Sequence, residues 1–354
     1  MRMSAFPAPS PLPRRTALLG LVAFLAIAVV ALWWAKWAPY ADRLRITDAT
    51  GAYPGHDVLA KAGEPGAAPS WSGAWAFLKA YADAVWPALV AGLLIAAAVE
   101  ALLPRTWLLR VLGAEGPGGR VAAATASLPG MMCTCCSAPI VRSLRRCGVS
   151  PANAVAYWLG NPVLNPAVIA FLAIVAPWSW VATRVAVGLV VVLGLPALVA
   201  RLTPARDHPV EIDATQEATG PAPVRYLRSL ARLAVLLIPE YLVVVLLVGG
   251  LRGWLLPIGD AATDLPVLIT LAAAVLGALV VIPTGGEIPL LTGLAAAGMG
   301  RGPIGALLIA LPAISLPSIA MVARALGTRA TVAVTAGVML CAVAAGGLLA
   351  VLGT

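Results

Sequence analysis

The sequence predicts an all-α polytopic membrane protein, and three observations lead to that prediction. Hydrophobic residues make up 61% of the 354 residues and charged residues only 11%, whereas a soluble domain averages about 25% charged residues. Apolar stretches long enough to span a bilayer recur along the chain. Proline and glycine interrupt several of these stretches. The net charge of +9 comes from arginines near their ends, which indicates orientation in a membrane and no nucleic-acid partner.

The first 83 residues are predicted to form three parts. Residues 1–16 are a Pro-rich cytoplasmic tail, and residues 17–38 are an N-terminal transmembrane helix. A cleaved signal peptide is the alternative, but the apolar run is too long for one. Residues 39–83 are polar and mixed in charge, which predicts a periplasmic loop. The end of that loop, Trp71 to Asp83, has apolar residues at helical spacing and is expected to lie on the membrane surface.

The rest of the chain is predicted to be an internal duplication. Residues 84–200 and 227–354 would be two transmembrane repeats, joined by a cytoplasmic linker at 201–226. Shifting the sequence by 150 residues aligns the two without a gap through their central region. The helix-breaking residues that fall in register are Pro139 with Pro289, Gly148 with Gly298 and Pro162 with Pro312.

The distribution of basic residues predicts that the two repeats are inverted relative to each other. Each repeat would contain about three transmembrane helices and one re-entrant broken hairpin, the first at residues 121–147. The protein is predicted to lie in the bacterial inner membrane. If its N-terminus is in the cytoplasm, most of the 24 Lys and Arg residues then lie on the cytoplasmic side. A model with the N-terminus outside and the hairpins as full spans satisfies the rule nearly as well. Inverted repeats with broken segments are typical of secondary transporters.

Three cysteines mark the predicted tip of the first hairpin. Cys133, Cys135 and Cys136 follow Pro129-Gly130, where a membrane helix would break. Thiolates prefer soft metals and metalloids, so these cysteines and Ser137 are predicted to bind substrate, the sulfurs holding a soft metalloid. No His or carboxylate completes a structural zinc site, and no cofactor is expected. The alternative is that the cysteines only fill space as small apolar residues.

The second hairpin is predicted to supply glycines and an acid to the same site. Gly285 and Gly286 align with the second and third cysteines and would let backbone approach a ligand closely. Among the acidic residues, Glu287 is the one that we expect to lie in the membrane interior. Ionisable residues there usually have a function, so Glu287 is predicted to couple transport to protons. Glu240 is a second candidate for that role. The alternative places Glu287 solvated at the outer mouth.

Two broken helices are predicted to complete the site. Asn161 and Asn165 each precede a proline, and Ser315 lies in the corresponding part of the second repeat. Their side chains could line the site or only bond the backbone that proline frees. Arg184 and Arg252 are expected to extend to the outer interface instead.

Three sequence runs resemble one known family. They are Cys-Thr-Cys-Cys-Ser-Ala-Pro at 133–139, Arg-Arg-Cys-Gly-Val-Ser at 145–150 and Trp-Leu-Gly-Asn-Pro-Val-Leu-Asn-Pro at 158–166. These runs are similar to the predicted permease family that includes the bacterial organoarsenical efflux permeases, over about residues 80–326. The resemblance implies export of small thiophilic molecules such as trivalent organoarsenicals, with cysteines in recognition. It does not assign that role to individual cysteines of this chain.

Together these observations predict a permease and not an enzyme. It would be a proton-coupled secondary exporter in the lipid bilayer, with a small-molecule substrate and a role in arsenical resistance. One alternative is a membrane thiol-disulfide enzyme, although both histidines, His56 and His208, fall in predicted loops. Another is a channel for a small sulfur-containing solute. The oligomeric state is left open.

Overall fold

The computed structural model describes residues 14–54, 68–114, 116–203, 220–255 and 266–352. These residues are helical, with turns between helices and no strand. Six helices are long and apolar enough to cross a membrane, or seven if one bent pair is counted as a single span. The predicted all-α polytopic membrane fold is therefore confirmed.

The N-terminal helix is longer than predicted. α1 (Arg14–Leu32), a π-helical turn (Trp33–Trp37) and α2 (Ala38–Thr50) follow one another without a break. The helix ends only at Gly51, whose φ of 67° an L-residue rarely adopts. Residues 39–50, expected in a loop, are thus helical. The one proline among them, Pro39, lies in the first turn of α2 directly after the π-helical segment, where a helix tolerates the missing N–H. The polar tail up to residue 13 and residues 55–67 of the predicted loop lie outside the described residues.

α3 (Trp71–Ala101) is one helix of 31 residues. Residues 71–83, expected as a separate helix on the membrane surface, are its first turns. The Ser70 side chain caps the helix start by accepting a hydrogen bond from the Gly73 N–H. No helix breaker follows until Pro87, which the helix accommodates in its interior.

The first hairpin has the predicted break. α4 (Arg105–Leu112) precedes it, and α5 (Pro117–Ser127) is its first arm. α6 (Thr134–Arg146) returns after a short 3₁₀ turn and three residues without regular secondary structure. Helices of 11 and 13 residues reach only about 16–20 Å, which is less than the roughly 30 Å of a hydrocarbon core. The Asn153 side chain, just after the hairpin, donates to the carbonyls of Leu112 and Ala114, just before it. The open ends of the hairpin therefore lie together.

A broken helix pair and a long helix complete the first half. α7 (Pro151–Val163) ends at Leu164, and α8 (Pro166–Val175) begins directly after Asn165. The break follows from the sequence, since a proline restricts the residue before it to non-helical backbone. α9 (Trp178–Leu202) follows. Residues 204–219, most of the predicted linker, lie outside the described residues.

The second half repeats the order of elements of the first. The long helix α10 (Ala222–Leu255) corresponds to α3, and α11 (Pro266–Leu279) and α12 (Glu287–Ala296) correspond to α5 and α6. α13 (Arg301–Ala313) and α14 (Leu316–Leu326) form a second broken pair, bent by 50°, before α15 (Thr328–Leu352). This order accords with the predicted duplication. The inverted orientation of the halves in a membrane stays a prediction.

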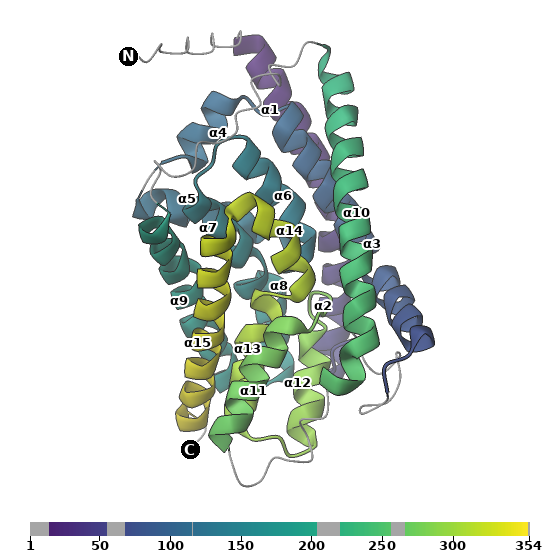
Figure 1. The fold of residues 1–354 in the computed structure, drawn as a ribbon, viewed down its shortest axis with the longest axis vertical. Helices are drawn as coiled ribbons and strands as arrows, with labels where there is room; N and C mark the ends of the chain where they lie inside the picture. Colours follow the sequence, from purple (N-terminus) through teal and green to yellow (C-terminus); the bar gives the residue numbers. More distant parts are fainter. Residues whose placement is uncertain (1–13, 55–67, 115, 204–219, 256–265, 353–354) are drawn as a thin grey trace.

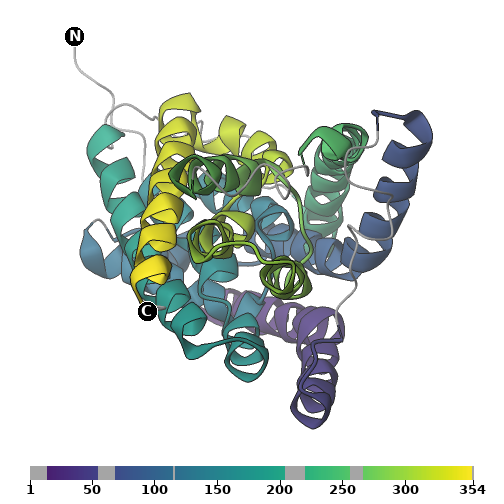
Figure 2. The ribbon, with the colours of Figure 1, turned by 90° about the horizontal axis from the view of Figure 1, so that it is seen from below.

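The two hairpins come from opposite ends of the molecule. In Figure 1, α5 and α6 lie in the upper half of the molecule, where α1 begins, whereas α11 and α12 lie in the lower half, where α15 ends. Long helices pair across the halves, α3 with α10 and α9 with α15. α1 packs mainly against α3 at the periphery, as the end-on view in Figure 2 shows. The interior where the hairpin tips meet is therefore enclosed by both halves.

Candidate functional site

The three predicted cysteines form one buried cluster. Cys133 precedes α6, and Cys135 and Cys136 lie in its first turn, so one turn of helix brings the three sulfurs to one side. The Cys133 Sγ lies 3.3 Å from the Sγ of Cys135 and 2.8 Å from that of Cys136, and all three sulfurs lie within 4.8 Å of one another. The hydroxyl of Tyr81 on α3 is 3.5 Å from the Cys135 Sγ. This geometry can present two or three sulfurs to a single soft centre.

The other two cysteines, Cys147 and Cys341, lie outside the cluster. Within it, Cys133 and Cys136 also have the Cys-x-x-Cys spacing at a helix N-terminus, which the sequence-based prediction did not use although it is visible in the sequence. That spacing is typical of thiol-disulfide chemistry. All five cysteines are free thiols.

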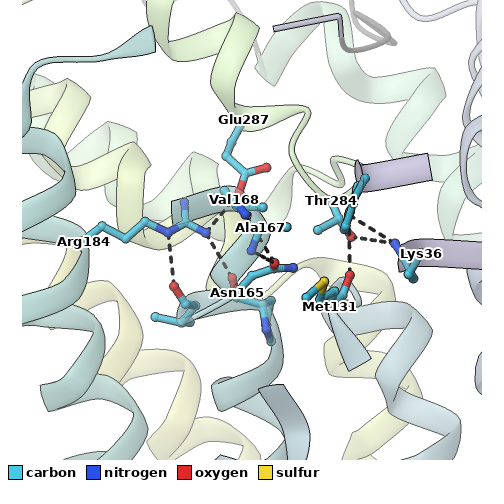
Figure 3. Close-up of polar contacts among 11 residues, drawn as sticks. Lys36, Met131, Asn165, Ala167, Val168, Arg184, Thr284 and Glu287 are labelled. Atoms are coloured by element: carbon cyan, nitrogen blue, oxygen red, sulfur yellow. Dashed lines mark hydrogen bonds and ion pairs between the residues drawn. The ribbon is translucent and has the colours of Figure 1, made fainter. Parts of the chain in front are cut away.

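Glu287, at the start of α12, forms a buried ion pair with Arg184 of α9. Their side chains are 4% and 0% exposed, and the Arg184 Nη2 donates to a Glu287 carboxylate oxygen at 3.1 Å. The guanidinium also donates to the carbonyls of Val163 at 3.1 Å and Pro162 at 3.0 Å (Figure 3). The expectation that Arg184 extends to the outer interface is therefore wrong: the break after α7 frees carbonyls that bind the cation inside. The side chain of Arg252 lies outside the described residues.

The side-chain oxygens of Asn161 and Asn165 accept hydrogen bonds from backbone N–H groups. Asn161 accepts the Met132 N–H at 2.7 Å, which fixes the turn before the cysteines. Asn165 caps α8 by accepting the N–H groups of Ala167 at 3.1 Å and Val168 at 3.3 Å (Figure 3). The buried Nδ2 atoms of both asparagines have no hydrogen-bond partner among the described residues. These amides support the broken backbone and leave two buried donors unused.

The two serines have different surroundings. Ser137 is fully buried and donates to the Thr134 carbonyl of its own helix at 3.1 Å. Ser315 lies at the start of α14, where its side chain and that of Ser318 form a capping box. The Ser315 Oγ is also 3.4 Å from the Thr134 Oγ1. Ser315 thus contacts the first hairpin tip from the second broken helix pair, whereas the Ser137 hydroxyl donates to a carbonyl of its own helix.

Two cavities lie at the hairpin tips, and Cys133 and Thr284 line both. The smaller, of about 10 Å³, has room for roughly one water molecule. Glu287, Pro162 and Ser315 also line it. The larger has a volume of about 220 Å³, and Gly286 lies in its wall. Of the predicted site residues, Cys133, Gly286, Glu287 and Ser315 therefore line these two neighbouring cavities.

The larger cavity also has walls that the sequence did not predict. Lys36, Tyr40, Arg43 and Tyr53 come from the N-terminal helix and the residues after it. The available signal was a lysine inside an apolar span, between Trp33-Trp34 and Trp37, since charged residues inside membranes are rare and functional.

Glu240 does not reach the cavities. It lies on α10, forms an ion pair with Arg142 of α6 at 3.6 Å, and neither residue lines either cavity. A similar contact nearby joins Glu100 of α3 to Arg232 of α10 and Arg146 of α6. These charges connect α3, α6 and α10 on the side of the cysteine helix away from its tip.

Gly285 is required by the backbone of the second tip. Its φ is 85°, and a Cβ there would lie 2.3 Å from the Tyr53 hydroxyl oxygen. We expect Gly285→Ala to destabilise the protein by about 1–2 kcal/mol from the left-handed backbone alone, in addition to the clash. The matched control is Gly293→Ala in α12, where a Cβ would meet nothing within 4 Å. Melting temperatures of the two purified variants compare them; equal values would show that the tip does not need a glycine.

A model of the predicted permease family matches residues 70–351 of this chain. The UPF0718 protein YraQ of Escherichia coli (strain K12) is 42% identical over 328 residues, which cover 92% of this chain and 93% of YraQ. No solved structure matches. The family match spans all the helices from α3 to α15, including both hairpins, the two broken pairs and the cysteine cluster. On this match, the chain belongs to the predicted permease family.

Proposed function

We propose that this permease is a secondary exporter of small thiophilic compounds, with trivalent organoarsenicals as the substrate class. The observation that carries the proposal is the convergence of three cysteine sulfurs within 4.8 Å of one another, with Cys133 in a cavity wall. Trivalent arsenic is a soft centre that prefers thiolate ligands. For a methylarsenic(III) dihydroxide, each As–S bond replaces one hydroxyl group, which leaves as water with the thiol proton. Two of the three sulfurs suffice, because the organic group occupies one valence.

The path would run between the two hairpins. Short helices from opposite ends meet at Cys133 and Thr284, and both residues line both cavities. We propose that the halves are inverted in the inner membrane, with the N-terminus in the cytoplasm, and that the site alternates between the two sides. Broken helices that meet near the bilayer centre are the usual arrangement for such transport.

Glu287 is the proposed proton-coupling residue. Protonation removes the charge that pairs with Arg184, whose guanidinium keeps its bonds to the carbonyls of Pro162 and Val163. Proton binding would therefore loosen α12 from α9 while α7 stays attached. Glu240, paired with Arg142, could respond in the same way between α10 and α6. Both pairs join helices of different halves, which is where alternating access requires movement.

Uptake into inverted membrane vesicles tests the export proposal. Vesicles containing the protein are expected to accumulate trivalent methylarsenical above the outside concentration when a proton gradient is imposed, and a protonophore should abolish accumulation. Equilibration without accumulation would indicate a channel. Absence of uptake together with turnover of a dithiol substrate would instead favour a thiol-disulfide enzyme, the alternative that the Cys-x-x-Cys spacing supports.

Glu287→Gln is expected to flatten the pH dependence of vesicle uptake, since a glutamine cannot gain or lose the proton. The amount of folded protein is compared first, because the change removes the negative charge beside the buried Arg184. Asp42→Asn is the matched control, as Asp42 forms an exposed pair with Arg45 and its side chain is 69% exposed. A full pH response in Glu287→Gln would remove Glu287 from proton coupling.

A further inference from the structure

The second tip faces a buried lysine that the function proposed above does not use. We propose that the 220 Å³ cavity is an anion-binding subsite in which Lys36 supplies the fixed positive charge. This proposal rests on the export function proposed above. The substrates would then be thiophilic compounds that also carry an anionic group, such as a carboxylate or sulfonate. The soft centre would bind the cysteine cluster while the anion lies against Lys36.

Lys36 is placed by an unusual turn of helix. It lies in the π-helical segment Trp33–Trp37, and π-helical turns occur often at functional sites. Its side chain is only 7% exposed. The Nζ donates to the Thr284 hydroxyl at 3.3 Å and to the Tyr40 hydroxyl at 3.4 Å, and Figure 3 shows it pointing at Thr284 from the side opposite Arg184. The N-terminal helix thus delivers a cation to the second hairpin tip.

Both hydrogen-bond partners of Lys36 are neutral. Among the described residues no carboxylate forms an ion pair with it, whereas the other buried cation beside the tip, Arg184, has Glu287. A buried charge without a counter-charge is strongly unfavourable. A third N–H of the ammonium group remains for a ligand, because lysine has three donors. An anion in the cavity would satisfy both the charge and the donor.

The charges around the cavity favour an anion. Arg43 is the second basic residue in its wall and Asp83 the one acidic residue among the described lining residues. Cys133 lies in the same wall, so one ligand can contact the cation and a sulfur together. Trp34 and Trp86, which also line the cavity, are 46% and 52% exposed. The cavity therefore reaches the protein surface, and a small solute can enter it.

Two thiol reagents of similar size and opposite charge test the subsite without transport. Purified protein in which Cys133 is the one remaining cysteine, through Cys135→Ser, Cys136→Ser, Cys147→Ser and Cys341→Ser, is treated with 2-sulfonatoethyl or 2-(trimethylammonio)ethyl methanethiosulfonate, so that no neighbouring thiol can displace the label. The Cys133 thiolate attacks the reagent sulfur, a mixed disulfide forms, and methanesulfinate leaves. Mass spectrometry identifies the labelled cysteine and gives both rates. The anionic reagent is expected to react faster, and Lys36→Met should lower the anionic-to-cationic rate ratio by about tenfold.

Two further variants make the result specific. Lys36→Arg should keep the ratio, because it keeps the charge. Lys79→Met should also keep it, since Lys79 is exposed and lies over the Trp75 ring away from the cavity lining. If Lys36→Met left the anionic-to-cationic rate ratio unchanged, the anion subsite would be wrong. It would also be wrong if neither reagent labelled Cys133, because the cavity would then admit no solute.

Vesicle uptake then separates this inference from the export proposal. Phenylarsine oxide and its para-carboxylate derivative share the soft centre and differ in charge. Lys36→Met should reduce uptake of the carboxylate by tenfold or more relative to the neutral compound. Equal loss of both would overturn the anion preference and leave export intact. If wild type transports neither compound, export is wrong, and the labelling ratio still decides whether the anion subsite exists.

Discussion

Replacing Cys135 and Cys136 together with serine is expected to abolish resistance to a trivalent organoarsenical and to lower vesicle uptake by more than about tenfold. The physical reason is that serine is a hard oxygen ligand, so Cys133 would be left as the one soft ligand of the cluster. Serine is also close to cysteine in size, so the buried first turn of α6 keeps its packing. Growth in the presence of the arsenical and uptake into inverted vesicles measure the effect.

The matched control for this variant replaces the two cysteines outside the cluster. Cys147→Ser with Cys341→Ser changes the same number of thiols, and neither residue belongs to the cluster of three converging sulfurs. It should leave resistance and uptake unchanged. Full resistance in Cys135→Ser/Cys136→Ser cells, with the protein present in the membrane, would reject the thiolate site and favour the reading in which the cysteines only fill space.

Arg184→Met is expected to destabilise the protein by about 3–5 kcal/mol, the usual consequence of leaving one member of a buried ion pair unpaired. Glu287 would be left 4% exposed with no cation beside it, and the carbonyls of Pro162 and Val163 would lose their donor. The variant should accumulate poorly in membranes and melt at a lower temperature in detergent. Thermal unfolding of the purified protein measures the difference.

The double variant Arg184→Met/Glu287→Gln is expected to recover part of this loss, because no buried charge then remains in the pair. The control is Arg45→Met: Arg45 and Asp42 form an exposed pair, with side chains 81% and 69% exposed, and such pairs contribute about 0–1 kcal/mol. If Arg184→Met melted like Arg45→Met, the buried ion pair would not stabilise the fold, and its proposed role in joining α9 to α12 would fail.

Much of the fold could be predicted because its signals are local. Apolar runs of bilayer length set the long helices, and the residues before Pro166 and Pro317 break the two helix pairs where the sequence indicated. The break before α6 was likewise expected. The extent of the N-terminal helix was not, because residues 39–50 have a loop-like polar composition and begin with Pro39. In the structure that proline falls in the first turn of α2, where a helix tolerates it, so the helix continues to Gly51.

The candidate site could be predicted in part. The cysteines, Glu287 and Ser315 were chosen for their chemistry and their place at breaks, and they line or adjoin the two cavities. The position of Arg184 was predicted wrongly, because a positive charge near a helix end commonly reaches the interface. Lys36 was not selected, since nothing local connects it to Thr284, which lies 248 residues further along the chain.

By itself, the sequence determined that this protein is an all-helical membrane protein with two broken hairpins and a thiol-rich tip. Those properties depend on composition, periodicity and helix breakers, which act over a few residues. Only the tertiary structure decided that Arg184 lies beside Glu287 and that Lys36 lies beside Thr284. The physical reason is that a buried charge is stabilised by whichever partner the packing of distant helices supplies.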